Sequence, residues 1–271
     1  MVRKSSGFLA GAAAVLIKDI TSEYAVKAVD SLSELPPSPE NSTLIAIPYL
    51  TYTPAELERL RDYILLGGRL ILADDFGHGN QVLEHLGLEV RFSGQTLLDP
   101  LVNYRGKYLP LVFISQPDPL TGNTDNVVFN RGTGLTGVSV NDTLALSSPF
   151  GFLDNNDDGV WEDNEPIGPL PVFSRHNLGK GQVVLVADPS IFINAMDRFG
   201  DNAVFIKNIM DASPVIYIDQ SHLTTSDLQH TKSWLRQARS LIANPAGTII
   251  LVAVVIVAAL QPVWHKRRNH E

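Results

Sequence analysis

The sequence predicts an α/β fold with three layers around a mostly parallel sheet, carrying a β-rich insertion and a C-terminal transmembrane helix. From about residue 24, short β-branched runs alternate with helical patterns, which favours parallel strands covered on both faces. Over about 95–174 the rhythm changes to short strands separated by Gly, Asn, Pro and Asp, which indicates an insertion. Residues 245–264 carry no formal charge, which is typical of a membrane span.

The first half of the domain contains the clearest helix signal. Thr53 is placed to cap it, Pro54 suits the first helical position, and Glu56 completes a capping box. The pair Gly67-Gly68 then ends the helix. Around this helix, strands are expected at 24–32, 42–50 and 69–75, and a second helix at 79–87.

The second half returns to the α/β pattern after the insertion. Within the insertion, strands are expected at 108–115, 126–130 and 143–148, and after it a strand at 181–190, helices at 190–200 and 201–211, and a strand at 214–220. The resulting organisation is an α/β domain over 1–222, a linker over 223–244, a transmembrane helix over 245–264 and a short basic tail over 265–271.

The two termini bear on localisation. A 20-residue uncharged helix is about 30 Å long, the thickness of a hydrocarbon core, and apolar residues cover every side of it. The basic residues 265–268 follow it, so the positive-inside rule predicts a single-pass protein of the cell membrane with its large domain outside the cytoplasm. Residues 1–20 fit either a signal or anchor segment or the first helix of the domain.

Composition excludes several functions. The formal net charge of -8 argues against a nucleic-acid partner, because phosphate binding needs a concentrated basic face. The chain has no cysteine, which excludes disulfides, thiolate metal sites and a thiol nucleophile. The triplet Gly179-Lys180-Gly181 leads into a strand and not into a helix, so we expect a hairpin turn and no nucleotide site.

The stretch DNNDDGVWEDNE, residues 154–165, matches the calcium-loop pattern D-x-[DN]-x-[DN]-G-x5-E at every specified position. Calcium needs six to eight oxygen ligands, and alternate residues of such a loop turn them inward. The expected ligands are Asp154, Asn156, Asp158, the Val160 carbonyl, Glu162 and Glu165. No helices flank the loop, so it is not an EF-hand, and a solvated acidic turn is the alternative.

Acidic residues follow several predicted strands. In open α/β sheets, ligands bind at the carboxyl ends of the strands. A candidate ligand crevice there comprises Asp74, Asp75, Asp188, Ser190, Asp219 and His222. Some of these residues, such as Asp188, and also Asp201, are equally suited to cap helices.

Several segments together resemble a known family. They are residues 50–80, 144–154, 179–209 and 215–223, of which GGRLILADDFG and VADPSIFIN are the most specific. The chain resembles the membrane-anchored family called domain of unknown function 4350, over most of residues 24–222. The resemblance implies a class I glutamine amidotransferase-like, or flavodoxin-like, fold between membrane anchors, and protein partners in a membrane complex. The amidotransferase nucleophile is a cysteine, so that activity is not carried over.

Two functions of different classes are compatible with these features. The first is a non-catalytic, membrane-anchored binding or scaffold domain outside the cytoplasm, stabilised by Ca²⁺. The second is a cell-envelope hydrolase that uses carboxylates or His222 at the strand ends as acid, base or metal ligand.

Overall fold

The computed structural model describes residues 24–192 and 196–223, which form one domain around a nine-stranded sheet with the strand order β1-β13-β2-β3-β12-β11-β9-β6-β7. Five neighbouring strands run parallel: β1 (Ala25–Val29), β13 (Val215–Asp219), β2 (Ser42–Ala46), β3 (Arg69–Ala73) and β12 (Gly181–Val186). Four antiparallel strands continue the sheet: β11 (Pro171–Leu178), β9 (Thr143–Ser147), β6 (Leu111–Ile114) and β7 (Asn126–Val128).

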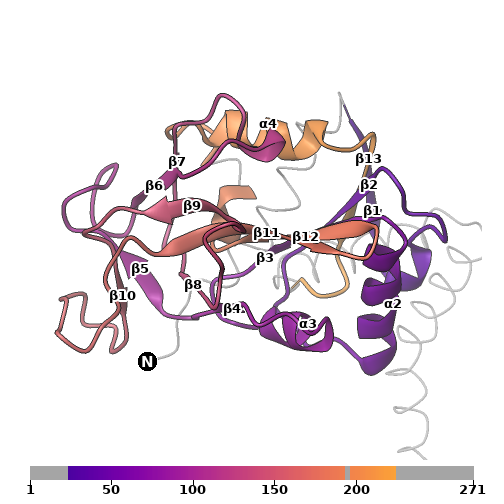
Figure 1. Ribbon diagram of the computed structural model, residues 1–271, viewed down its shortest axis with the longest axis horizontal. Helices are drawn as coiled ribbons and strands as arrows, with labels where there is room; N and C mark the ends of the chain where they lie inside the picture. Colours follow the sequence, from indigo (N-terminus) through magenta and orange to yellow (C-terminus); the bar gives the residue numbers. More distant parts are fainter. Residues whose placement is uncertain (1–23, 193–195, 224–271) are drawn as a thin grey trace, which may run out of the picture. The chain divides into compact units, whose positions relative to one another are not determined.

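Two further strand pairs lie outside the main sheet. One joins β5 (Thr96–Leu98) to β10 (Phe152–Asp154), and the other joins β4 (Arg91–Phe92) to β8 (Leu135–Thr136). Figure 1 shows β5 and β10 beyond the antiparallel part of the sheet, away from β1 and β2.

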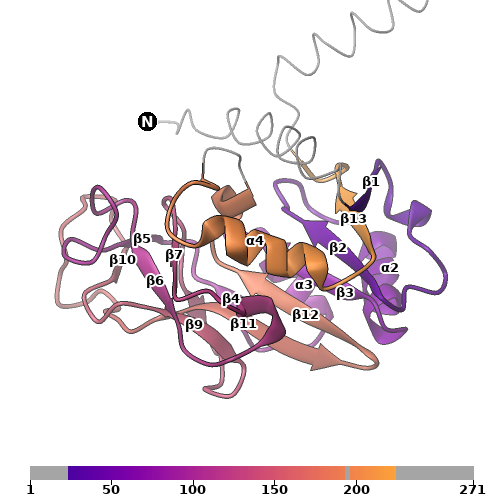
Figure 2. The ribbon, with the colours of Figure 1, turned by 90° about the horizontal axis from the view of Figure 1, so that it is seen from above.

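Three α-helices and three 3₁₀ turns occur in the described part of the chain. They are α2 (Pro54–Leu65), α3 (Asn80–His85), α4 (Asn202–Asp211), η1 (Leu32–Glu34), η2 (Pro119–Thr121) and η3 (Pro189–Phe192). Figure 1 places α4 on one side of the sheet and α2 and α3 on the other, and Figure 2 shows α4 lying across the sheet. The five residues of β2 are all buried, as expected for a strand between two covered faces.

The expected start of α2 is confirmed. The Thr53 side chain accepts a hydrogen bond from the Glu56 N–H, and the Glu56 carboxylate accepts one from the Thr53 N–H. Beyond the C-terminal end of α2, the backbone of Gly68 lies close to the first residue of β12: a Cβ added to Gly181 would lie 2.1 Å from the carbonyl oxygen of Gly68. Glycine is therefore required at this approach of strand to helix.

The predicted fold class is wrong in its description of the sheet. A three-layer, mostly parallel fold with a separate β-rich insertion was expected, whereas four of the eight pairings in the sheet are antiparallel and helices are few among the described residues. The reason is that β6, β7 and β9, all within 95–174, join the main sheet, because β11 forms a hairpin with β12 and offers its other edge to β9.

The membrane helix also gains no support from the described structure. No helix within 24–192 or 196–223 is both long and apolar enough to cross a bilayer. The span predicted at 245–264 lies outside the described residues, as do the segment 1–20, residues 224–244 of the linker and the basic tail 265–271.

Candidate functional site

The parallel strands bring the predicted crevice residues to one edge of the sheet. Asp219 ends β13, Asp74 follows β3, and Asp188 lies two residues beyond β12. In the strand order, β2 separates β13 from β3, while β3 and β12 are neighbours. The acidic residues therefore form two groups, one around Asp74 and Asp188 and one around Asp219.

In the first group, Asp74 and Asp188 both bind backbone N–H groups. Asp74 accepts from Phe76 at 2.9 Å and from Gly79 at 2.6 Å. Asp188 accepts from Asn130 at 2.6 Å and from Ser190 at 2.8 Å. Both carboxyl groups are buried, at 2% and 0% exposure. They act as caps of the turns that follow their strands.

Burial also shifts the pKa of each of these two groups. Burial raises the pKa of Asp188 to about 7, although the N–H groups of Asn130 and Ser190 favour its ionised form. Burial likewise raises the pKa of Asp74, against the opposing N–H groups of Gly79 and Phe76. Of the remaining predicted members, Asp75 is half-buried. The hydroxyl of Ser190 is buried and donates to the Asn130 carbonyl at 3.2 Å, and the Ser190 side chain also hydrogen-bonds the Asp188 carboxyl group, whose pKa it lowers.

A tyrosine that the sequence did not single out lies against this first group. The Tyr49 hydroxyl oxygen is buried and has no hydrogen-bond partner within the described structure. Burial raises the pKa of Tyr49 well above its usual value, and the negative charges of Asp75, Asp188 and Asp74 raise it further. Wherever these carboxyl groups are ionised, they give the carboxyl ends of β3 and β12 a negative potential around a buried hydroxyl.

The second group is centred on Asp219 and His222. Nδ1 of His222 lies 2.7 Å from Oδ2 of Asp219, and its Nε2 lies 3.6 Å from Oε2 of Glu56. The ring of Tyr52 stacks on the imidazole with a centroid distance of 3.8 Å, and its hydroxyl donates to Asp219 at 3.3 Å. The imidazole thus joins the end of β13 to the first turn of α2.

This group favours an ion pair. Burial alone lowers the pKa of His222, but the hydrogen bond and charge of Asp219, with the charge of Glu56, outweigh it and the net pKa is raised. Burial alone raises the pKa of Asp219, but hydrogen bonds from His222 and Ser221 outweigh it and the net pKa is lowered. Ser221 shares Nδ1 of His222 with Asp219, so the three residues do not form a serine–histidine–aspartate relay, which needs both ring nitrogens.

The acidic loop 154–165 lies away from this edge, after β10. Its first and last specified residues, Asp154 and Glu165, are each 4% exposed, while Asn156, Asp158, Val160 and Glu162 are exposed. Gly159 takes φ +76°, a conformation suited to glycine, and donates its N–H to Oδ2 of Asp154 at 3.0 Å. No three His, Cys, Asp or Glu side chains come together as a metal cluster anywhere in the described ranges.

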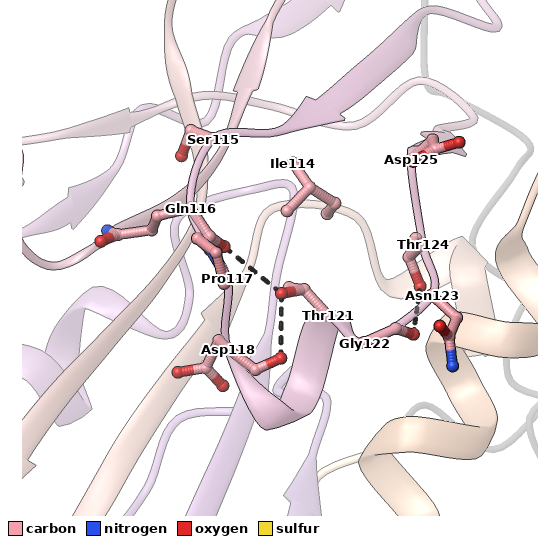
Figure 3. A pocket seen from close by; sticks show the side chains of 10 residues that line it. All are labelled: Ile114, Ser115, Gln116, Pro117, Asp118, Thr121, Gly122, Asn123, Thr124 and Asp125. Atoms are coloured by element: carbon pink, nitrogen blue, oxygen red, sulfur yellow. Dashed lines mark hydrogen bonds between the residues drawn. The ribbon is translucent and has the colours of Figure 1, made fainter.

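A shallow hollow of about 350 Å³ was not predicted from the sequence. It is lined by residues 114–118 and 121–125, and Figure 3 shows Ile114 and Thr121 on its wall. The Thr121 hydroxyl bridges the carbonyls of Gln116 and Asp118, at 3.4 and 3.2 Å. Because β6 runs opposite to β12, this hollow lies at the other edge of the sheet from the acidic groups.

The comparisons with known proteins bear on family and fold. The family model described as "Domain of unknown function (DUF4350)" matches residues 10–210. The chain belongs to the DUF4350 family. No curated protein matches the DUF4350 chain in sequence.

Solved structures align with the DUF4350 chain at low sequence identity. The N-terminal domain of mmIFT52 aligns with a TM-score of 0.52 and 14% identity, over 73% of this chain and 88% of that one. A putative ThuA-like protein from Bacteroides uniformis gives a TM-score of 0.44 and 14% identity, over 76% and 84%. A β-galactosidase from Bacillus circulans sp. alkalophilus gives 0.41 and 14%, over 64% of this chain and 23% of that one.

Tyr49, Tyr52 and Glu56 are the site residues of the DUF4350 chain that sequence reasoning missed. All three lie between β2 and the first turn of α2, whereas the sequence signals came from single residues directly after strands. A signal was nevertheless present for Tyr49, because it follows the carboxyl end of β2, the strand between the two acidic groups.

Proposed function

We propose that the DUF4350 chain is a non-catalytic binding or scaffold domain. It receives a cationic group of a protein partner at the carboxyl ends of β3 and β12. The observation that carries the non-catalytic part of this proposal is the use of Asp74, Asp188 and Asp219 as caps and ion-pair partners. Their oxygens bind N–H groups, hydroxyls or His222 within the domain. Carboxylates so engaged serve structure, whereas a hydrolase needs them directed at a reacting bond.

The electrostatics of the edge support a cationic partner. Asp74, Asp75 and Asp188 all act on Tyr49, and the chain as a whole has a formal net charge of -8. A lysine or arginine side chain meets favourable charge there, and the buried Tyr49 hydroxyl is a polar group without a partner. β3 leads to α3 on one face of the sheet, and β12 leads to α4 on the opposite face. The carboxyl ends of β3 and β12 are therefore a point where the chain connections switch faces, and α/β domains commonly bind ligands at such points.

One observation favours the hydrolase as a second candidate. Asp188 has a pKa of about 7, which is the value expected of a general acid at neutral pH. Its side chain is fully buried, however, and both of its oxygens accept backbone N–H groups.

The test combines turnover with partner binding. The purified full-length chain is assayed against chromogenic glycosides, esters, amides and phosphate esters, with Asp188→Asn as the variant. Partner capture by cross-linking in intact cells is then compared between wild type, Asp75→Asn, Tyr49→Phe and the distant control Asp163→Asn. We expect no turnover, and weaker capture of one defined partner by the Asp75 and Tyr49 variants. Turnover that is lost in Asp188→Asn would replace this proposal with the hydrolase.

A further inference from the structure

We infer that the loop 154–165 is a calcium site that closes the end of the domain formed by β5 and β10. This inference goes beyond the proposed binding function, because the loop and the acidic edge share no residue. It rests on a buried, unpartnered carboxylate oxygen in a loop whose two ends are already held together.

The base of the loop is formed by backbone pairing. Asp154 is the last residue of β10 and pairs with Thr96 of β5. On the returning side, the Leu153 N–H donates to the Pro166 carbonyl at 3.0 Å, and Phe152 forms a β-bridge with Ile167. The loop is therefore closed without the helices of an EF-hand, and an ion that binds there does not have to bring its ends together.

Asp154 supplies the main evidence for a ligand. Its Oδ2 accepts the N–H of Gly159 from the middle of the loop, so the carboxylate faces the loop interior. Its Oδ1 is buried and has no hydrogen-bond partner, while the residue is 4% exposed. A buried carboxylate oxygen without a partner is strongly unfavourable, and a cation is the partner that such an oxygen binds best.

Glu165 is positioned to close the site. Its Oε1 accepts the Asn155 N–H at 2.6 Å and its Oε2 accepts the Glu162 N–H at 3.1 Å. The buried side chain thus reaches both sides of the loop. Each carboxylate oxygen has a second lone-pair direction, so these single N–H contacts leave capacity for a metal.

The remaining ligands lie on the exposed rim. The Asn156 amide donates to Asp158 at 3.2 Å, which keeps these two side chains together. Every candidate ligand, including the Val160 carbonyl, is an oxygen, and such sites favour a hard cation. Since no three carboxylates converge within the described structure, binding must draw the rim inward, and we expect a weak dissociation constant on the order of 10⁻⁴ to 10⁻³ M.

Binding would also affect the neighbouring loop. Lys107 donates from Nζ to the Gly159 carbonyl at 2.5 Å, and a Cβ added to Gly159 would lie 3.4 Å from the Tyr108 hydroxyl. The middle of the acidic loop is therefore in contact with the segment that follows β5. An ion that fixes Gly159 would restrain both segments together.

Calorimetric titration of the full-length chain with CaCl₂ tests the inference. We expect saturable heat when wild type is titrated with calcium, and weaker binding of magnesium. In Asp154→Asn, the dissociation constant for calcium should rise at least tenfold. The matched control Asp163→Asn removes the same charge from an exposed residue of the same stretch that is not a predicted ligand, and it should bind calcium as wild type does. If Asp154→Asn does not fold, the exposed Asp158→Asn replaces it, with folding judged by the thermal midpoint in EDTA.

Terbium(III) gives a second, local measurement, because Trp161 belongs to the loop and its indole N–H donates to the Glu165 carbonyl at 3.3 Å. We expect tryptophan-sensitised terbium emission that calcium displaces, and that Trp161→Phe abolishes while calorimetric calcium binding persists. Absence of saturable heat at 10 mM calcium would overturn the inference. So would an equal loss of binding in Asp154→Asn and Asp163→Asn, since that result would indicate only general charge attraction.

Discussion

The side-chain amide of Asn202 hydrogen-bonds both backbone groups of Val128, as a neighbouring strand would. Its oxygen accepts the Val128 N–H at 2.8 Å and its nitrogen donates to the Val128 carbonyl at 3.0 Å. Val128 ends β7, the last strand of the sheet. Beside it, Oδ2 of Asp201 accepts the N–H groups of both Asp125 and Asn126, at 2.9 and 3.2 Å. The start of α4 therefore covers a strand edge that would otherwise be open to pairing with another chain.

We expect Asn202→Ala to destabilise the domain by about 2–4 kcal/mol, because it removes two hydrogen bonds and leaves two buried backbone groups unsatisfied. Urea unfolding of the full-length chain, followed by far-UV circular dichroism, measures this change. Lys207→Ala is the control on the same helix, and since its ion pair with Asp211 is exposed, it should change the stability far less than Asn202→Ala does. Equal stability of the two variants would show that the backbone groups of Val128 on the outer side of β7 do not depend on Asn202.

The buried carboxyl of Asp188 predicts a dependence of stability on pH. Its folded pKa of about 7 lies above an unfolded value of about 3.9, so between these values the folded state holds a proton that the unfolded state has lost. The contribution of Asp188 is fully present below about pH 4 and is lost as the pH rises through about 7. Its upper limit is about 4 kcal/mol, from about 1.4 kcal/mol per pKa unit.

Comparison with Asp188→Asn isolates this effect. The asparagine cannot titrate, and it places an amide donor against a backbone N–H at every pH. We therefore expect the variant to be much less stable than wild type at pH 5 and closer to wild type at pH 8, as measured by urea unfolding at both. A difference that does not change with pH would show that Asp188 stays ionised throughout.

In the pair of His222 and Asp219, the histidine has the same direction of pH dependence as Asp188, and the aspartate has the opposite one. The stability from His222 is fully present below its unfolded pKa of about 6.5 and is lost as the pH rises through its raised folded value. The stability that Asp219 contributes is present above its unfolded pKa of about 3.9, and it is lost as the pH falls through the lowered pKa of Asp219 in the folded state. His222→Phe, which keeps an aromatic ring beside Tyr52, should cost about 3–5 kcal/mol near pH 5.5 and less at pH 9.

The exposed His78 provides the control for this histidine. His78→Phe removes an imidazole from the surface, so it should change the stability far less than His222→Phe does at both pH values. If His222→Phe lost the same free energy at pH 5.5 and pH 9, packing against Tyr52 and not charge would account for the loss.

Local signals in the sequence were sufficient for several elements. The capping box of Thr53 and Glu56 lies within four residues, and α2 begins where it predicts. The turn at Gly179-Lys180-Gly181 is confirmed as the hairpin between β11 and β12. Contacts within a few residues determine both features, so a single sequence contains them.

Features that depend on distant pairing could not be predicted in this way. Asp201 was expected to cap its own helix, but it makes no such bond and binds Asp125 and Asn126, 76 and 75 residues earlier. The antiparallel half of the sheet likewise depends on β11 pairing with β9 across a long connection. The same limit applies to the candidate site. Asp188 could be predicted because it comes soon after β12 in the sequence, whereas Tyr49 comes from a distant segment, after β2, and lies near Asp188 only in the folded chain.

Substitution of Tyr49 tests whether the acidic group around Asp74 and Asp188 serves binding. A buried hydroxyl without a partner costs free energy, so Tyr49→Phe should leave stability unchanged or raise it by up to about 1 kcal/mol. The control is Tyr63→Phe, in which the lost hydroxyl has a partner, Ser42, at 2.8 Å, and it should lower stability by about 1 kcal/mol. Thermal and urea unfolding of both variants measure the difference. A Tyr49→Phe variant that is no less stable but captures its partner more weakly would mean that the hydroxyl serves binding. A loss of stability equal to that of Tyr63→Phe would mean that the hydroxyl is already satisfied within the fold, and the edge would lose its support as a binding site.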